Sequence, residues 1–105
     1  MSDSFAPHDP EAAERAVGIL KALSHVGRLR ILCHLIERDM NVGELSEALD
    51  EPQASVSQQL MRLRAEGFVR PVRHGKHVVY KLGREDIAPV IGALRDSLCP
   101  RGVPG

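Results

Sequence analysis

Apolar residues recur at three- and four-residue spacings in the first third of the chain, which is the pattern of amphipathic helices. One such segment starts at Glu11, and its apolar stripe consists of Ala13, Ala16, Val17, Leu20 and Leu23. A second segment follows Ser24 and His25, and its apolar positions are Leu29, Leu32, Cys33 and Ile36. The first ten residues contain two prolines and no periodicity. We therefore predict a flexible N-terminal tail over residues 1–10, followed by two amphipathic helices.

Two short helices joined by a tight turn are predicted in the middle of the chain. Asn41 stands at an N-cap position and Glu44 follows three residues later, which is the spacing of a capping box. The helix that begins there has one apolar face, formed by Leu45, Ala48 and Leu49. The next helix begins near Gln53 and ends at Gly67. Its expected buried positions are Val56, Leu60 and Leu63.

The last third of the chain predicts a β-hairpin followed by a helix. Strand-like runs occupy residues 68–73 and 77–82, on either side of the turn-like sequence at residues 74–76. A final helix begins near Arg84, and its apolar face consists of Ile87, Ile91, Leu94 and Leu98. We therefore expect one mainly α domain with a small β-hairpin over residues 11–99, and a C-terminal tail over residues 100–105.

Length and charge narrow the function classes. The 105 residues suffice for one domain but not for two independent cores. Fourteen Lys and Arg residues balance fourteen Asp and Glu residues, which excludes a uniformly basic coat for nucleic acid. Positive charge is nevertheless concentrated between Ser55 and Lys81, where Glu66 is the only acid. The cations of this segment are Arg62, Arg64, Arg70, Arg73, Lys76 and Lys81.

The helix from Gln53 has an outer face suited to reading DNA. Gln and Arg side chains make bidentate contacts with base edges, and Ser contacts bases or phosphates. The candidate DNA contacts on this helix are Gln53, Ser55, Ser57, Gln58, Gln59 and Arg62. In the hairpin, Arg73 and Lys76 suit the phosphate backbone. The order of these elements is that of a helix-turn-helix followed by a wing, with the second helix in the major groove.

The ordered segments of the chain resemble the ArsR family of winged-helix repressors over roughly residues 12–99. The segments that carry this resemblance are residues 22–25, 28–32, 42–45, 54–60, 63–69 and 75–80. The resemblance implies a homodimer formed by the first and last helices. It also implies that the partner is double-stranded operator DNA of palindromic sequence, released when an inducer acts. One departure is Val26-Gly27, where many relatives place a proline.

The resemblance also directs attention to metal ligands, because metal ions and arsenite are inducers in this family. Residues 42–49 contain no cysteine and residues 84–98 contain no histidine, so both familiar metal sites are missing. His74 and His77 flank the hairpin turn, but two histidines leave a zinc site short of ligands. We expect no metal site and no cofactor.

Cys33 and Cys99 are the two cysteines of the chain. One thiol on the second helix and one at the end of the last helix resemble the sulfide- and persulfide-responsive repressors of the SqrR, BigR and HlyU type. This resemblance implies that reactive sulfur species or oxidants join the two thiols and weaken operator binding. The link is left open between a disulfide, a trisulfide and a tetrasulfide. For Cys33, an inert buried thiol is the competing interpretation.

Three other functions compete with this hypothesis. A metal- or arsenite-responsive repressor needs a non-standard ligand set. A thiol oxidoreductase is disfavoured because the chain has no Cys-x-x-Cys motif, and we expect no enzyme activity. A winged helix that binds protein is the third.

Targeting signals are missing from the sequence as given. No segment approaches the roughly 20 apolar residues of a membrane span, and Met1 to Pro10 has neither a basic start nor an apolar run. We expect a cytoplasmic protein with no membrane partner.

Overall fold

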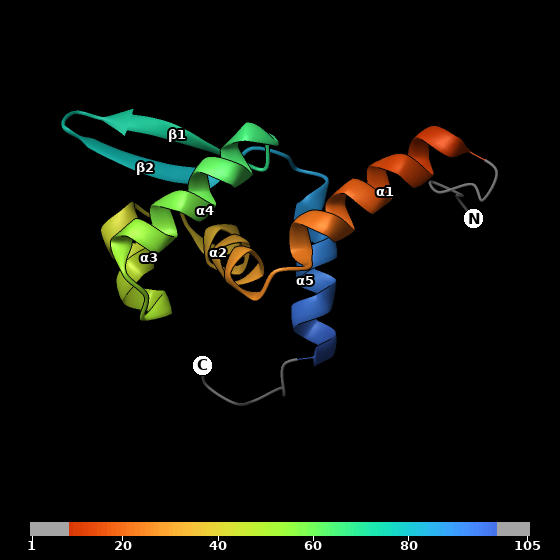
Figure 1. Cartoon of the computed structure of the whole chain (residues 1–105), viewed down its shortest axis with the longest axis horizontal. Helices are drawn as coiled ribbons and strands as arrows, with labels where there is room; N and C mark the ends of the chain where they lie inside the picture. Colours follow the sequence, from red (N-terminus) through yellow and green to blue (C-terminus); the bar gives the residue numbers. More distant parts are fainter. Residues whose placement is uncertain (1–8, 99–105) are drawn as a thin grey trace.

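The computed structural model describes residues 9–98, and five helices and a two-stranded antiparallel hairpin lie within that range (Figure 1). In chain order they are α1 (Pro10–Leu23), α2 (Val26–Glu37), α3 (Val42–Leu49), α4 (Gln53–Ala65), β1 (Val69–His74), β2 (His77–Leu82) and α5 (Ile87–Leu98). The mainly α architecture with a small hairpin is therefore confirmed. Most of the N-terminal tail, the whole C-terminal tail and Cys99 lie outside the described residues.

Helix α2 lies at the centre of the fold. It packs against the other four helices and against β2. Its buried apolar residues are Ile31, Leu32 and Leu35, whereas Leu29, Cys33 and Ile36 are only partly buried. All four predicted positions thus contact the core, but Ile31 and Leu35 extend the buried surface beyond the expected stripe, because neighbours cover α2 from several directions.

Helix α1 begins one residue earlier than predicted and buries its predicted apolar face only in part. The Asp9 carboxylate accepts hydrogen bonds from the backbone N–H groups of Glu11 (3.1 Å) and Ala12 (3.3 Å), and Pro10 occupies the first turn. Two residues of the predicted apolar stripe are uncovered, Val17 at 48% and Leu20 at 60% exposure, whereas Leu23 is buried and Ala13 and Ala16 are partly buried. Figure 1 shows the reason: α1 extends away from the other elements, at the opposite end of the molecule from the hairpin.

The capping box at the start of α3 is confirmed. The Asn41 side-chain oxygen accepts from the Glu44 N–H at 2.7 Å, and the Glu44 carboxylate accepts from the Asn41 N–H at 2.9 Å. The Asn41 backbone N–H, followed by the Arg38 guanidinium, lowers the pKa of Glu44. Its contribution to stability is therefore complete above the ordinary carboxylate pKa and is lost as the pH falls through the lowered one. Ala48 was predicted to share the apolar face of this helix but is exposed, whereas Leu45 and Leu49 are buried.

The hairpin is anchored to the rest of the fold by Phe68, which precedes β1, and by Tyr80 in β2. Its strands pair from Val69 with Leu82 to His74 with His77, and Gly75 adopts the positive φ of 63° that the two-residue turn requires. His74 therefore belongs to β1. Phe68, predicted to start the strand, is instead a core residue with 2% exposure. Met40 and Tyr80 exchange two backbone hydrogen bonds, which tie β2 to the segment before α3.

Within residues 9–98, no helix has both the length and the apolar character that crossing a bilayer requires.

Asn41→Ala tests the capping box. Loss of an N-cap side chain costs about 1 kcal/mol of unfolding free energy, because backbone donors of the first turn lose their acceptor. We expect a lower midpoint in urea denaturation, whereas Asn41→Asp, which keeps an acceptor, serves as the control. Equal midpoints for Asn41→Ala and the unmodified protein would contradict the role of this cap.

Candidate nucleic-acid interface

The rotation of α4 about its axis decides which of its side chains face outward. Val56, Leu60 and Leu63 are buried with exposures of 0–1%, as predicted, and they hold this face of α4 against the core. Gln53, Gln58 and Arg62 are consequently exposed, in agreement with the predicted DNA-reading face. Ser55, Ser57 and Gln59 are only partly buried and lie at the flanks. A polar face on α4 is thus available for base edges.

Ser55 is engaged within the protein. Its hydroxyl donates a hydrogen bond to the Glu51 carboxylate at 3.2 Å, and the Ser46 hydroxyl bonds to the Glu51 carbonyl. These contacts organise the turn between α3 and α4, together with Asp50 in the left-handed region at φ 56°. Ser55 therefore lies in the first turn of α4, and its hydroxyl is bonded to the turn residue Glu51 four positions before it.

Two polar grooves lie on either side of the exposed face of α4. The first, of about 340 Å³, lies against the start of α2 and is lined by residues 25–28 together with Gln58, Gln59 and Arg62. The second, of about 400 Å³, lies against the hairpin and is lined by Arg64, Pro71, Arg73, Val78 and Tyr80. Arginine side chains contribute to both grooves, so cationic groups flank the reading face on both sides.

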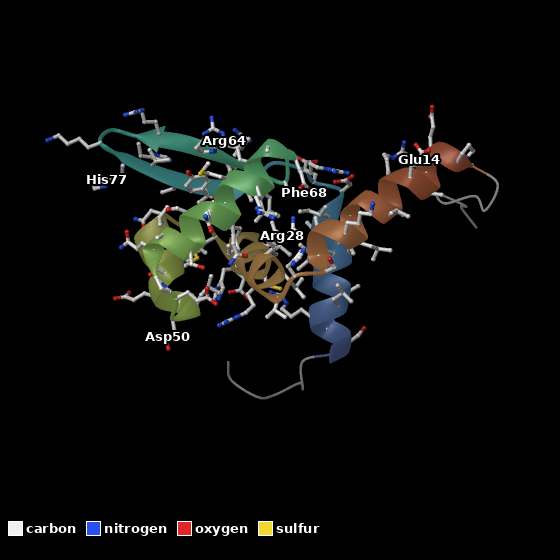
Figure 2. All side chains as sticks on the ribbon, viewed as in Figure 1. Glu14, Arg28, Asp50, Arg64, Phe68 and His77 are labelled. Carbon is white, nitrogen blue, oxygen red and sulfur yellow. The ribbon has the colours of Figure 1, made fainter. Side chains whose placement is uncertain are left out.

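Arg64 is a candidate contact that the sequence analysis did not select. It lies on α4 beside the hairpin, where it lines the same groove as Arg73 (Figure 2). Its place in the basic segment was visible in the sequence. Its approach to the hairpin was not, because that depends on how β1 and β2 fold back along α4.

The end of the hairpin carries exposed cations. Arg73 and Lys76 are both exposed, one in β1 and the other in the turn after Gly75. His74 and His77 form the last pair of the hairpin, and Figure 2 shows His77 far from the core residue Phe68. Among residues 9–98, no group of three or more His, Cys, Asp or Glu side chains is arranged to hold a metal ion.

The ion pairs of the described residues do not include the three cations that were predicted to contact DNA. The pairs are Arg28 with Glu66, Arg38 with Glu44, Arg84 with Asp86, and Arg95 with Glu37. The Arg84 guanidinium stacks on Phe68 at 4.7 Å, and its hydrogen bond to Asp86 lowers the pKa of that carboxyl. Within residues 9–98, neither Arg62, Arg73 nor Lys76 takes part in such a pair. Their charge is therefore available to phosphates.

Of the two thiols predicted to sense sulfur species, Cys33 lies within the described residues and Cys99 lies outside them. Cys33 lies on α2 and is partly buried against the core. Cys99 lies outside the described residues, one position beyond the end of α5. The structure therefore describes the surroundings of Cys33 and the helix that leads to Cys99.

A helix-turn-helix with an exposed polar reading helix and a cationic β-hairpin defines a winged-helix DNA-binding protein. Residues 25–70 match the model of the family described as "Bacterial regulatory protein, arsR family". The chain is 36% identical over 104 residues to the biofilm growth-associated repressor of Xylella fastidiosa (strain Temecula1), covering 94% of this chain and 91% of that one. This chain therefore belongs to the ArsR family of DNA-binding transcriptional regulators, which are not enzymes.

Other similar proteins include the transcriptional activator HlyU of Vibrio cholerae. That protein is 36% identical over 85 residues, covering 81% of this chain and 79% of HlyU. The structure of reduced HlyU from Vibrio cholerae N16961 superposes with a TM-score of 0.80 at 34% identity, covering 86% of this chain and 95% of that one. The winged-helix fold is therefore shared across nearly the whole described chain.

Arg62→Ala and Lys76→Ala test the interface. Loss of the Arg62 guanidinium, a charged hydrogen-bond donor on the exposed face of α4, should weaken operator binding by about 1.5–3 kcal/mol. Removal of the Lys76 ammonium from a phosphate should weaken all DNA sequences equally and reduce the salt dependence of binding by about one unit. Fluorescence anisotropy with operator and unrelated DNA at several salt concentrations measures both effects. Arg15→Ala, which removes the same charge from α1, should bind normally, and normal binding by all three variants would contradict this interface.

Proposed function

We propose that the protein is a homodimeric repressor that releases a palindromic operator when reactive sulfur species or oxidants link Cys33 to Cys99. The proposal is supported most directly by one observation: α2, which carries Cys33, packs against α5, which leads to Cys99. A covalent link between α2 and α5 would fix the position of the DNA-binding elements, α4 and the hairpin, relative to the proposed dimer interface. Because its partner is operator DNA, we place the protein in the cytoplasm.

Exposed apolar side chains support dimerisation through α1 and α5. The exposed large apolar residues of the described chain include Val17 and Leu20 on α1 and Leu94 on α5. Val17 also lines a groove of about 380 Å³ on α1, together with Ala13 and Gly18. Burying a Leu side chain contributes about 1.5–3 kcal/mol, so a second copy that covers these residues gains stability. A C2 dimer also suits a palindrome whose half-sites lie about 34 Å apart.

An ion pair between α2 and α5 supports the thiol hypothesis. The Arg95 guanidinium donates to the Glu37 carboxylate at 2.8 Å, although the two residues are 58 positions apart. Glu37 lies four residues after Cys33 and Arg95 lies four residues before Cys99. The Arg95 side chain is 37% exposed and the Glu37 side chain is 64% exposed. An ion pair this exposed contributes only about 0.2–1 kcal/mol to stability. Its proposed role is therefore to orient the two helices rather than to hold the fold together.

The proposed chemistry balances with a persulfide as oxidant. The Cys33 thiolate attacks the terminal sulfur of R–S–SH, so Cys33 becomes a persulfide and RS⁻ leaves. The Cys99 thiolate then attacks the Cys33 sulfur, which forms the disulfide and releases HS⁻. A trisulfide forms instead when both thiols become persulfides and one sulfur leaves as hydrogen sulfide.

Repression rather than activation is the proposed direction of control. The similar proteins include one named a repressor and one named an activator. Release of DNA on thiol linkage accounts for a repressor most simply, since the reduced protein then occupies the operator. The similar structure described as reduced HlyU belongs to a protein whose redox state was defined, which fits thiol chemistry in this group.

Cys33→Ser tests the sensing proposal. We expect glutathione persulfide to weaken operator binding by the unmodified protein by about tenfold, equivalent to 1.4 kcal/mol. The variant should bind as the reduced protein does and should not respond to treatment, because the attacking thiolate is missing. Electrophoretic shift with a Cys99→Ser control measures this. Intact mass identifies the link, since each retained sulfur adds about 32 Da, and equal binding in all samples would defeat the proposal.

Leu20→Glu tests the proposed dimer. Leu20 is 60% exposed in the protomer, so a carboxylate there disturbs no contact of the protomer's own core. Across a dimer interface the same carboxylate would be buried without a partner, which is costly. We expect a monomer by light scattering and weaker operator binding, whereas Ala48→Glu on the exposed side of α3 should stay dimeric. An unchanged dimer in Leu20→Glu would rule out this part of α1 as the interface.

A further inference from the structure

The groove between the first turn of α2 and the side of α4 is not explained by base reading. Four of its lining residues are consecutive, His25, Val26, Gly27 and Arg28, and none of these belongs to the helix-turn-helix or the hairpin. The remaining residues, Gln58, Gln59 and Arg62, come from α4. The groove therefore brings the start of α2 to the edge of the reading face. Figure 2 shows Arg28 between α2 and α4.

Gly27 allows α4 to approach the start of α2 closely. A Cβ atom at residue 27 would lie 2.5 Å from the Oε1 atom and 2.6 Å from the Nε2 atom of Gln59, which is far inside contact distance. The side-chain amide of Gln59 consequently lies directly against the α2 backbone. Gln59 was predicted to contact DNA from the flank of α4, and its side chain is part of the lining of this groove.

The charges around the groove suit an anion. Arg62 takes part in no ion pair within residues 9–98, and His25 is exposed and makes no capping hydrogen bond through its side chain. Arg28 is 8% exposed, and its guanidinium contacts the Lys21 carbonyl (3.4 Å) and the Glu66 carboxylate (3.7 Å). No acid is among the residues that line the groove, and Arg28 pairs with Glu66 beside it. The first turn of α2 contains no acidic residue.

We propose that this groove binds one phosphate of the operator backbone. The proposal rests on the proposed function, in which α4 enters the major groove of DNA. A helix in the major groove is bordered by the two phosphate backbones, so a cationic groove along its side meets a backbone phosphate. Arg62 and His25 supply cationic or hydrogen-bonding groups, and the amides of Gln58 and Gln59 supply neutral donors. Together they would fix the register of α4 without reading a base.

Val26→Glu gives the sharpest test. Val26 is 75% exposed at the first position of α2, where a carboxylate is favoured by the helix dipole, so the melting temperature should not fall. A carboxylate at the groove repels a phosphate. We expect operator and unrelated DNA to bind about tenfold more weakly, and the salt dependence to drop by ~0.9 for each phosphate that is no longer bound. Val26→Gln introduces a side chain of the same shape as Glu but without the charge, and this variant should bind DNA as the unmodified protein does.

Gly27→Ala tests the same groove by shape. The added methyl group must displace the end of the Gln59 side chain, which is flexible, so the fold should be retained. We expect weaker binding of all DNA sequences at an unchanged melting temperature. In a Gln59→Ala background the collision is removed, and Gly27→Ala should then have little further effect.

The outcomes separate this proposal from the proposed function. Unchanged DNA binding in Val26→Glu would overturn the phosphate site while leaving operator binding intact. If Val26→Glu lost operator binding but bound unrelated DNA normally, the groove would be reading bases, and this result would also overturn the phosphate site. Inorganic phosphate at constant ionic strength probes a free anion as the alternative occupant. A rise in melting temperature that Val26→Glu abolishes, with unchanged operator affinity, would favour the free anion over DNA.

Discussion

Burial of α2 is the constraint on which the other elements depend. Ile31 and Leu32 have no exposed surface, and the helix that carries them contacts every other helix and one strand of the hairpin. Each such side chain contributes about 1.5–3 kcal/mol, so displacement of any neighbour from α2 is costly. The reading helix, the hairpin and α5 are therefore positioned relative to one common partner. The start of α2 reaches the side of α4, and its last residue, Glu37, reaches α5 through Arg95.

The charge that the surface presents depends on which cations are paired with acids as well as on where the charged residues lie in the sequence. The chain has a net charge of zero, yet the four ion pairs of residues 9–98 involve arginines 28, 38, 84 and 95. The cations of the reading helix and of the hairpin end take no part in them. The surface offered to DNA is consequently more positive than the balanced composition suggests. Balance elsewhere limits non-specific attraction to DNA, which is dominated by charge and weakens with salt.

Local signals in the sequence predicted the elements that lie around the reading helix. The capping box at Asn41 requires residues only three positions apart, and Gly67 and Gly75 provide the positive φ angles that end α4 and turn the hairpin. The predictions failed where burial depends on a distant partner. Phe68 is a core residue rather than the start of a strand, and Val17 and Leu20 of the α1 stripe are uncovered within the protomer.

The sequence by itself determined the type and order of the elements, the polar face of α4, the segregation of charge and the family. These properties follow from helix and strand periodicity, from capping residues and from ordered motifs, all of which are local. Only the tertiary structure decided that Gln59 lies against Gly27, that the Ser55 hydroxyl bonds to Glu51, and that Arg64 borders the hairpin. It also decided that Arg95 pairs with Glu37, 58 positions away. Such contacts join separate elements, and their geometry is set by how the core packs around α2.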